Sequence, residues 1–313
     1  MKVLVPEGPM RRELEPLPDG VQLVAEPAPD VEFVILNFDV AGRLPALLDE
    51  LPGLRVIQSL SAGVDWLLPK VPPGIVVCRA VGVHDAPVSE WVLAVILVTR
   101  RRLLEFWDLQ RRAEWNRDIA EATDGWQHAI DDLEGATVLV VGHGSIGRAV
   151  AARLAPFGAH VIGVARHPRD DARSADELPR LLPEADVVVN LLPLVPQTEK
   201  FVDAAFLSRM KQGSLFVNAG RGKTVDTEAL LAALKSGRIH AALDVTDPEP
   251  LPSDHPLWQA PNLFITPHVA GAVARWESRG YRFAGEQIRR HAAGEPLLGI
   301  EAGNMETARR LAD

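Results

Sequence analysis

Short runs of β-branched residues alternate with helix-sized segments along most of the chain. In the first third, residues 2–5, 31–36, 55–57 and 75–77 form such runs, and residues 45–51 have a helical pattern. Short, largely apolar runs that do not alternate strictly with polar residues are typical of strands buried on both faces of a parallel sheet. The pattern therefore predicts an α/β lobe with a parallel sheet.

A second series of strands follows a longer helical stretch. One continuous helix is predicted over residues 88–111, with an apolar face suited to packing between two lobes. Six buried strands, separated by helices or helix-sized gaps, are then predicted at 137–141, 160–164, 186–190, 214–218, 241–245 and 263–266. Strands joined by such crossovers form a doubly wound parallel sheet.

The last predicted helix, at residues 275–291, is expected to return to the first lobe. The first lobe is then discontinuous in sequence, and 313 residues accommodate two domains better than one. We expect a substrate domain at residues 1–95 plus 283–313 and a dinucleotide-binding domain at residues 96–282. The predicted fold class is α/β, with a Rossmann nucleotide domain and a smaller, flavodoxin-like substrate domain.

Composition narrows the class of protein. Lys plus Arg is 33 and Asp plus Glu is 42, giving a net charge of −9, so neither nucleic acid nor an anionic membrane is an expected partner. The most apolar run, residues 92–98, is too short to span a bilayer. A single cysteine, Cys78, permits no intramolecular disulfide and no cysteine-built metal site. With no secretory signal in the first residues, we expect a cytoplasmic protein without a metal.

A glycine-rich turn joins the strand at 137–141 to a helix. Glycine in the G-x-G-x-x-G spacing permits a tight turn, the close approach of a pyrophosphate, and close packing of helix and strand. The helix N-terminus then faces the phosphate charge. We expect these residues to bind a dinucleotide, and a plain glycine-rich turn is the alternative: Gly142, Gly144, Ser145, Ile146 and Gly147.

The second strand of this unit lacks the acid that binds the ribose 2′-hydroxyl in NAD enzymes. Ala165 stands near that position, and Arg166 and Arg169 follow it. Two guanidinium groups suit a 2′-phosphate, so we expect NADP to be favoured, with NAD possible. The alternative is that both are ordinary surface arginines neutralised by Asp170 and Asp171.

Reactive side chains follow three later strands. Hydride transfer between a nicotinamide and a 2-hydroxy acid needs a proton donor or acceptor, a cation for the substrate and a group that orients the base. His268, Arg221 and Glu249 can supply these three functions. A glutamate beside the histidine raises its pKa and keeps a proton available near neutral pH. Each residue taken singly also has an ordinary structural interpretation.

Several motifs in order resemble those of the D-isomer-specific 2-hydroxyacid dehydrogenases. They are residues 191–198, beside the cofactor in that family, and the arginine, glutamate and histidine motifs at 210–226, 242–251 and 266–268. The resemblance implies a catalytic Arg221, Glu249 and His268, reversible reduction of 2-oxo acids to D-2-hydroxy acids, and a homodimer formed through the nucleotide domains. It also implies cofactor contacts from Leu192, Pro193, Thr198, Ala219 and Asp244.

The segment at residues 60–65 is similar to the family's substrate loop. Successive backbone N–H groups can bind an anion, so Ala62, Gly63 and Val64 are expected to receive the substrate carboxylate, with a plain tight turn as the alternative. The roles of His84 and Asp85 stay open. Two tryptophans, Trp115 and Trp126, are expected in core packing rather than at a neighbouring subunit's active site.

Glyoxylate and hydroxypyruvate are the small 2-oxo acids that the resemblance suggests as substrates. A formate dehydrogenase is disfavoured, because that activity accompanies glutamine rather than glutamate beside the histidine, and this chain has Glu249. The alternative from another class is a dinucleotide-sensing protein of the corepressor type, which shares this fold and triad. Turnover of 2-oxo acids distinguishes the two.

Overall fold

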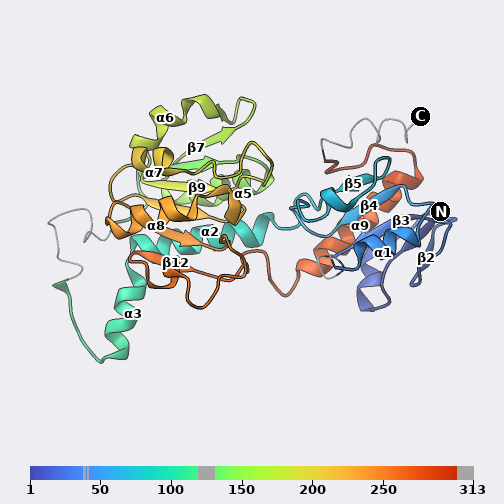
Figure 1. Ribbon diagram of the computed structural model, residues 1–313, viewed down its shortest axis with the longest axis horizontal. Coiled ribbons are helices and arrows are strands. Elements are labelled where there is room, and N and C mark those ends of the chain that lie inside the picture. The colour runs from blue at the N-terminus through green and yellow to red at the C-terminus, as the bar shows by residue number, and fades with distance from the viewer. Residues whose placement is uncertain (38–39, 41, 119–130, 302–313) are drawn as a thin grey trace. The chain divides into compact units, whose positions relative to one another are not determined.

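The computed structural model describes residues 1–37, 40, 42–118 and 131–301 of the chain (Figure 1). The chain divides into two compact units, one formed by Met1–His84 with Val273–Asp313 and the other by Asp85–Ala272. These bounds lie about ten residues before those predicted from the sequence. The difference arises because the helix that begins at Asp85 lies wholly in the second unit, and the helix that begins at Trp276 lies wholly in the first.

The first unit contains a five-stranded, all-parallel sheet in the order β2-β1-β3-β4-β5, the flavodoxin-like order. Its strands are β1 (Lys2–Leu4), β2 (Gln22–Val24), β3 (Val31–Leu36), β4 (Val56–Ser59) and β5 (Val76–Cys78), and its helices are α1 (Leu44–Asp49) and α9 (Trp276–Ala292). Leu44 of α1 belongs to the buried cluster on one face, and Ala284 and Ile288 of α9 to that on the other. The predicted parallel lobe is confirmed. The sequence did not reveal β2, a three-residue edge strand with no buried residue.

The second unit contains a seven-stranded parallel sheet in the order β12-β11-β10-β9-β6-β7-β8. Its strands are β6 (Thr137–Val141), β7 (His160–Ala165), β8 (Arg173–Ser174), β9 (Val187–Asn190), β10 (Leu215–Asn218), β11 (His240–Leu243) and β12 (Leu263–Ile265). This is the doubly wound order, so the predicted Rossmann fold is confirmed. Six strands were predicted; the seventh, β8, has two residues and is too short to leave a hydrophobic run.

The helices of the second unit are α2 (Asp85–Arg100), α3 (Leu103–Arg111), α5 (Ser145–Leu154), α6 (Leu178–Leu181), α7 (Ala204–Arg209) and α8 (Thr227–Lys235). The prediction of one continuous helix over 88–111 was wrong. Arg102 adopts a left-handed conformation with φ of 52°, and its guanidinium pairs with Glu105, so the chain changes direction between α2 and α3. Within the described ranges, no helix is long and apolar enough to cross a bilayer.

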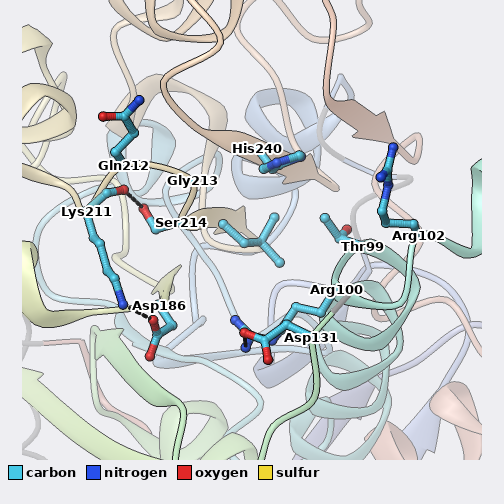
Figure 2. A pocket seen from close by; sticks show the side chains of 11 residues that line it. Thr99, Arg100, Arg102, Asp131, Asp186, Lys211, Gln212, Gly213, Ser214 and His240 are labelled. Atoms are coloured by element: carbon cyan, nitrogen blue, oxygen red, sulfur yellow. Dashed lines mark hydrogen bonds and ion pairs between the residues drawn. The ribbon is translucent and has the colours of Figure 1, made fainter. Parts of the chain in front are cut away.

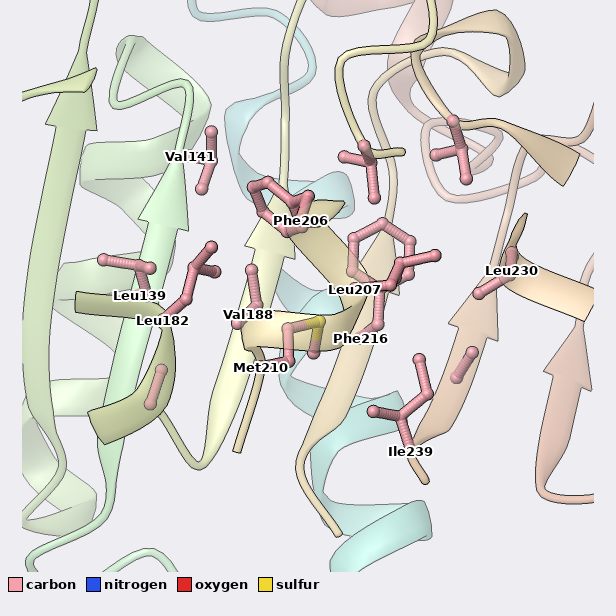
Figure 3. Close-up of a cluster of buried hydrophobic side chains, with 14 of the residues drawn as sticks. Leu139, Val141, Leu182, Val188, Phe206, Leu207, Met210, Phe216, Leu230 and Ile239 are labelled. Atoms are coloured by element: carbon pink, nitrogen blue, oxygen red, sulfur yellow. The ribbon is translucent and has the colours of Figure 1, made fainter. Parts of the chain in front are cut away.

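Two hydrophobic clusters cover the faces of the seven-stranded sheet. On one face, Val188 and Phe216 of the sheet pack with Phe206 and Leu207 of α7 (Figure 3). On the other, Val92 and Ile96 of α2 join Val150 and Leu154 of α5 against β6, β9 and β10. Because both faces are buried, polar side chains concentrate at the strand ends. The carboxyl ends of all seven parallel strands share one edge, where a ligand site is expected.

Candidate active site

Three neighbouring strands bring reactive residues to the carboxyl edge of the seven-stranded sheet. In register, β10 pairs with β11 and β11 pairs with β12, all in parallel. Arg221 follows the last residue of β10 by three positions, Asp244 directly follows β11, and His268 follows the last residue of β12 by three. The strand order therefore collects side chains that are far apart in the sequence.

His268 and Glu249 form a direct pair. The imidazole Nδ1 lies 2.6 Å from Oε1 of Glu249, and both side chains are about half-exposed. The hydrogen bond to Glu249 raises the pKa of His268 above its ordinary value, opposed by partial burial and by the nearby positive charge of Arg221. The positive charge of Arg221 thus acts on the imidazole and lowers its pKa. Because Nδ1 is paired with Glu249, the other ring nitrogen, Nε2, is the atom that can exchange a proton with a ligand.

Asp244 organises the loop that carries His268. Its buried carboxylate accepts hydrogen bonds from the Thr266 hydroxyl at 2.6 Å, from Val269 N at 2.8 Å and from Ala270 N at 2.9 Å. His268 itself has φ of 55°, a conformation that costs energy in a residue with a side chain and that often occurs at functional sites. Asp244 thus holds this loop, and a contact between Asp244 and the cofactor stays a prediction.

A buried polar network holds the loop that carries Arg221. The Asn190 side-chain amide donates to Oδ1 of Asn218 at 3.0 Å and to the Thr224 hydroxyl at 2.8 Å. The Thr224 hydroxyl in turn donates to the Arg221 carbonyl at 2.6 Å. Sequence reasoning missed these residues. The available signal was an asparagine ending a wholly buried apolar strand, in β9 and again in β10.

The glycine-rich turn has the form that a dinucleotide requires. Gly142 has φ of 97°, and a Cβ there would lie 2.7 Å from the Leu191 carbonyl, so only glycine fits. Helix α5 begins at Ser145 with Gly144 as an N-cap that offers no side-chain acceptor. The N–H groups of Ser145, Ile146 and Gly147 donate to no acceptor in the part of the chain that the structure describes. These donors fit a pyrophosphate.

The predicted cofactor loop lies between the glycine-rich turn and the arginine loop. A Cβ on Gly220 would meet the Leu192 carbonyl at 2.7 Å, so the two loops are in contact. The Thr198 hydroxyl donates to the Pro193 carbonyl at 2.6 Å and closes this loop on itself. Ala219 N donates to the Asn190 carbonyl at 3.2 Å. Cofactor contacts from Leu192, Pro193, Thr198 and Ala219 stay predictions.

The two arginines after β7 differ in their surroundings. Arg169 donates through Nη2 to the His143 carbonyl at 2.6 Å and pairs through Nε with Asp171 at 3.2 Å. Arg166 is exposed, and no hydrogen bond or ion pair of its side chain occurs within the described residues. Arg169 is therefore attached to the glycine-rich turn, whereas Arg166 is free to move toward a ligand.

The predicted substrate loop belongs to the first unit. Within the described chain, the N–H groups of Ala62, Gly63 and Val64 donate no hydrogen bond, while the Val64 carbonyl accepts from Leu67 N. Three unsatisfied donors in succession support anion binding. His84, whose role was left open, lies at hydrogen-bond distance through Nε2, 3.0 Å from the Leu60 carbonyl, and so supports the start of this loop.

The two tryptophans were expected in core packing. For Trp115 this expectation is wrong, because it follows α3 in an irregular segment and 95% of its side chain is exposed. Trp126 lies outside the described residues. Asp85 is the first residue of α2, and its carbonyl accepts a hydrogen bond from the Ser89 hydroxyl.

A cavity of about 280 Å³ lies at the opposite, amino edge of the same sheet (Figure 2). Its walls include Asp186, Ser214 and His240, which stand at the starts of β9, β10 and β11. Two ion pairs lie within its walls, Lys211 with Asp186 at 2.5 Å and Arg100 with Asp131. Because it lies at the amino edge, the cavity is separate from the His268–Glu249 pair at the carboxyl edge. Among the described residues, no group of His, Cys, Asp and Glu side chains is arranged to hold a metal ion.

Known proteins similar in sequence to this chain are 2-hydroxyacid dehydrogenases and reductases. Residues 93–270 match the profile described as D-isomer specific 2-hydroxyacid dehydrogenase, NAD binding domain. A glyoxylate/hydroxypyruvate reductase B of Citrobacter koseri is 38% identical over an alignment of 243 residues, and the match covers 73% of this chain and 72% of that protein.

Two solved structures cover nearly the whole chain. One is a probable 2-hydroxyacid dehydrogenase from Rhizobium etli, in complex with NADP, HEPES and L(+)-tartaric acid, with a TM-score of 0.77, 30% identity and 96% of each chain covered. The other is an NADPH-dependent glyoxylate/hydroxypyruvate reductase from Sinorhizobium meliloti, in complex with NADP and sulfate. It has a TM-score of 0.80 and 27% identity, and the match covers 96% of this chain and 97% of that chain.

Proposed function

The chain belongs to the D-isomer specific 2-hydroxyacid dehydrogenase family, and we propose that it reduces small 2-oxo acids such as glyoxylate and hydroxypyruvate to D-2-hydroxy acids. The family makes it an NAD(P)-dependent oxidoreductase. The observation that carries the proposal is the His268–Glu249 pair, 2.6 Å apart, at the carboxyl edge of the sheet within electrostatic reach of Arg221.

Arg221, Glu249 and His268 have separate roles in the proposed reaction. Arg221 binds the 2-oxo acid and polarises its carbonyl oxygen. When bound, the dinucleotide supplies the hydride that C2 of the substrate receives. His268, protonated and held by Glu249, donates the proton from Nε2 to the carbonyl oxygen, and the neutral imidazole accepts it in the reverse reaction. The N–H groups of Ala62, Gly63 and Val64, which donate no hydrogen bond to any described residue, bind the substrate carboxylate.

NADP is the favoured cofactor, and NAD a weaker one. The reductase from Sinorhizobium meliloti is NADPH-dependent by its description, and the Rhizobium etli structure contains NADP. In this chain, Ala165 ends β7 where an NAD enzyme carries an acid, and Arg166 and Arg169 follow. Without the acid, the 2′-hydroxyl of NAD loses its partner, while a 2′-phosphate gains cationic ones.

A panel of 2-oxo acids assayed with both cofactors tests this function. We expect glyoxylate and hydroxypyruvate to be reduced, with kcat/KM for NADPH about tenfold or more above that for NADH, because each charge-assisted contact to a phosphate adds affinity. Turnover of none of the acids would instead support the alternative, a dinucleotide-sensing protein of the corepressor type. Formate with NAD or NADP serves as a negative control.

A homodimer is the proposed assembly, supported by exposed apolar side chains on and after α3. Leu103 and Trp107, four residues apart on α3, are 49% and 55% exposed, and Trp115 is 95% exposed. Large exposed apolar side chains that gather on one surface mark protein interfaces. Trp107→Glu is expected to shift the sedimentation coefficient from dimer to monomer, because a charge is costly in an apolar interface. Leu298→Glu, at an exposed apolar position of the first unit, should leave the sedimentation coefficient unchanged. If both variants were monomers, or both dimers, an interface at α3 would be contradicted.

We also propose a cytoplasmic location. Cys78 is the single cysteine of the chain, and it is buried as a free thiol whose pKa burial raises to about 12. A chain that uses no disulfide suits a reducing compartment.

A further inference from the structure

Four ionisable side chains meet beside the glycine-rich turn, three of them basic. The carboxylate of Asp171 accepts a hydrogen bond from Arg169 Nε at 3.2 Å. Its other oxygen lies 3.9 Å from Arg148 Nη1 and 3.8 Å from His143 Nε2. The three basic groups come from separate elements, namely the turn after β7, the helix α5 and the glycine-rich turn. One carboxylate thus occupies the centre of a basic cluster.

This cluster is fixed to the dinucleotide-binding elements. Arg148 directly follows Gly147 in the first turns of α5, and Arg169 also donates to the His143 carbonyl. The His143 ring is only 6% exposed and lies on β7, where a Cβ on Gly163 would come 2.4 Å from the ring Cγ. The cluster therefore lies at the end of β7, where this fold recognises the 2′ position of the adenosine ribose.

A phosphate monoester is a better ligand for the guanidinium groups of Arg148 and Arg169 than the carboxylate of Asp171. It carries close to two negative charges at neutral pH and three acceptor oxygens, so it can satisfy both guanidinium groups together. Asp171 is 45% exposed in its ion pairs, and exposed pairs contribute little stability. The hydrogen bond from Arg169 lowers the pKa of Asp171, so the carboxylate is charged at neutral pH. Burial lowers the pKa of His143, so its ring is uncharged there.

We propose that Asp171 is an internal competitor for the 2′-phosphate of NADP(H), and that Arg148 binds this phosphate together with Arg169. The carboxylate must leave the two guanidinium groups when the phosphate arrives, so Asp171 reduces the affinity for NADP(H) and leaves that for NAD(H) unchanged. Asp171 thereby sets how strongly the protein distinguishes the two cofactors. This inference rests on the proposed NADP preference and adds residues that the glycine motif and Arg166 do not include.

The test is the binding of two ligand pairs to Asp171→Asn, measured by isothermal titration calorimetry without substrate. The pairs are NADPH with NADH, and adenosine 2′,5′-bisphosphate with 5′-AMP. We expect both 2′-phosphorylated ligands to bind about three- to fivefold more tightly, which is the upper part of the effect that one exposed ion pair has on affinity. The affinities for the other two ligands should change by less than about twofold. Asp170→Asn is the matched control, because it removes the same charge from an adjacent exposed residue with no ion pair among the described residues.

A second pair of variants tests the arginine. Arg148→Ala is expected to weaken adenosine 2′,5′-bisphosphate about tenfold and 5′-AMP less than twofold. Arg153→Ala is the control, because Arg153 lies on the same helix but pairs with Glu90 at 3.6 Å rather than with Asp171. This variant should change the affinity for neither ligand. Circular dichroism melts establish that each variant is folded.

Four results would overturn the proposal. Equal gains in Asp171→Asn and Asp170→Asn would mean that only net charge matters. Weaker NADPH binding in Asp171→Asn would mean that the carboxylate orients the arginines. Unchanged binding in Asp171→Asn, with an NADPH-preferring wild type, would remove Asp171 from the site. A wild type that binds NADPH no better than NADH would contradict the NADP preference itself, and the inference with it.

Discussion

Replacing His268 with alanine should lower kcat for 2-oxo acid reduction by about 10³-fold, in the range that general acid catalysis contributes. The reason is that Nε2 of His268 is the proposed proton donor, and its contact with the substrate oxygen strengthens only as the reaction proceeds. The Kd for NADPH should stay within about twofold of the wild-type value, because the imidazole makes its essential contact with substrate rather than cofactor. Stopped-flow turnover and fluorescence titration measure the two quantities.

His160→Ala is the matched control for this variant. His160 is an exposed histidine at the amino end of β7, at the opposite edge of the same sheet from His268. Its replacement should leave kcat unchanged. A loss of NADPH affinity as steep as the loss of turnover in His268→Ala would contradict the assigned role, because it would indicate a collapsed site rather than a missing proton donor.

Replacing Glu249 with glutamine should lower kcat/KM for reduction on the order of 10²-fold at pH 8 and displace the pH profile. Glu249 raises the pKa of His268 through its hydrogen bond and its charge. Reduction uses the protonated imidazole, so activity is present below the pKa of His268 and is lost as the pH rises through it. Glutamine has no charge and lowers this pKa, so the decline in activity should begin at a lower pH.

The oxidative direction provides an independent check on Glu249. Oxidation uses the neutral imidazole as base, so its rise with pH should also move to lower pH in the glutamine variant. Glu184→Gln, at an exposed position between α6 and β9, should move neither profile. An unchanged reductive profile in Glu249→Gln would show that the pair seen at 2.6 Å does not control the proton.

Much of the fold followed from the sequence because its strands are buried on both faces. A strand such as β6 or β9 has a continuous apolar run that no other element of that length requires. Elements without this signature were missed. The two residues of β8 and the half-exposed β2 are defined by pairing with a neighbouring strand, and the break at Arg102 depends on one backbone angle.

The chemistry of the site was predictable as a set of residue types, because the glycine spacing and the arginine, glutamate and histidine motifs are local in sequence. The supporting residues were not. Asp244 holds the His268 loop through Thr266, and Asn190 holds the Arg221 loop through Thr224. The hydrogen bonds from Thr266 to Asp244 and from Asn190 to Thr224 join residues 22 and 34 positions apart, and nothing in the local pattern of an asparagine or threonine indicates its partner.

The amino-acid sequence by itself determined the alternation of strands and helices, the turn that requires glycine at Gly142, and the identity of the reactive groups. Those properties depend on side-chain volume, polarity and backbone freedom within a few residues. Only the tertiary structure decided that His268 contacts Glu249 and that Asp171 lies among Arg148, Arg169 and His143. Such contacts depend on strand order in the sheet, which hydrophobic burial and parallel pairing fix across the whole domain.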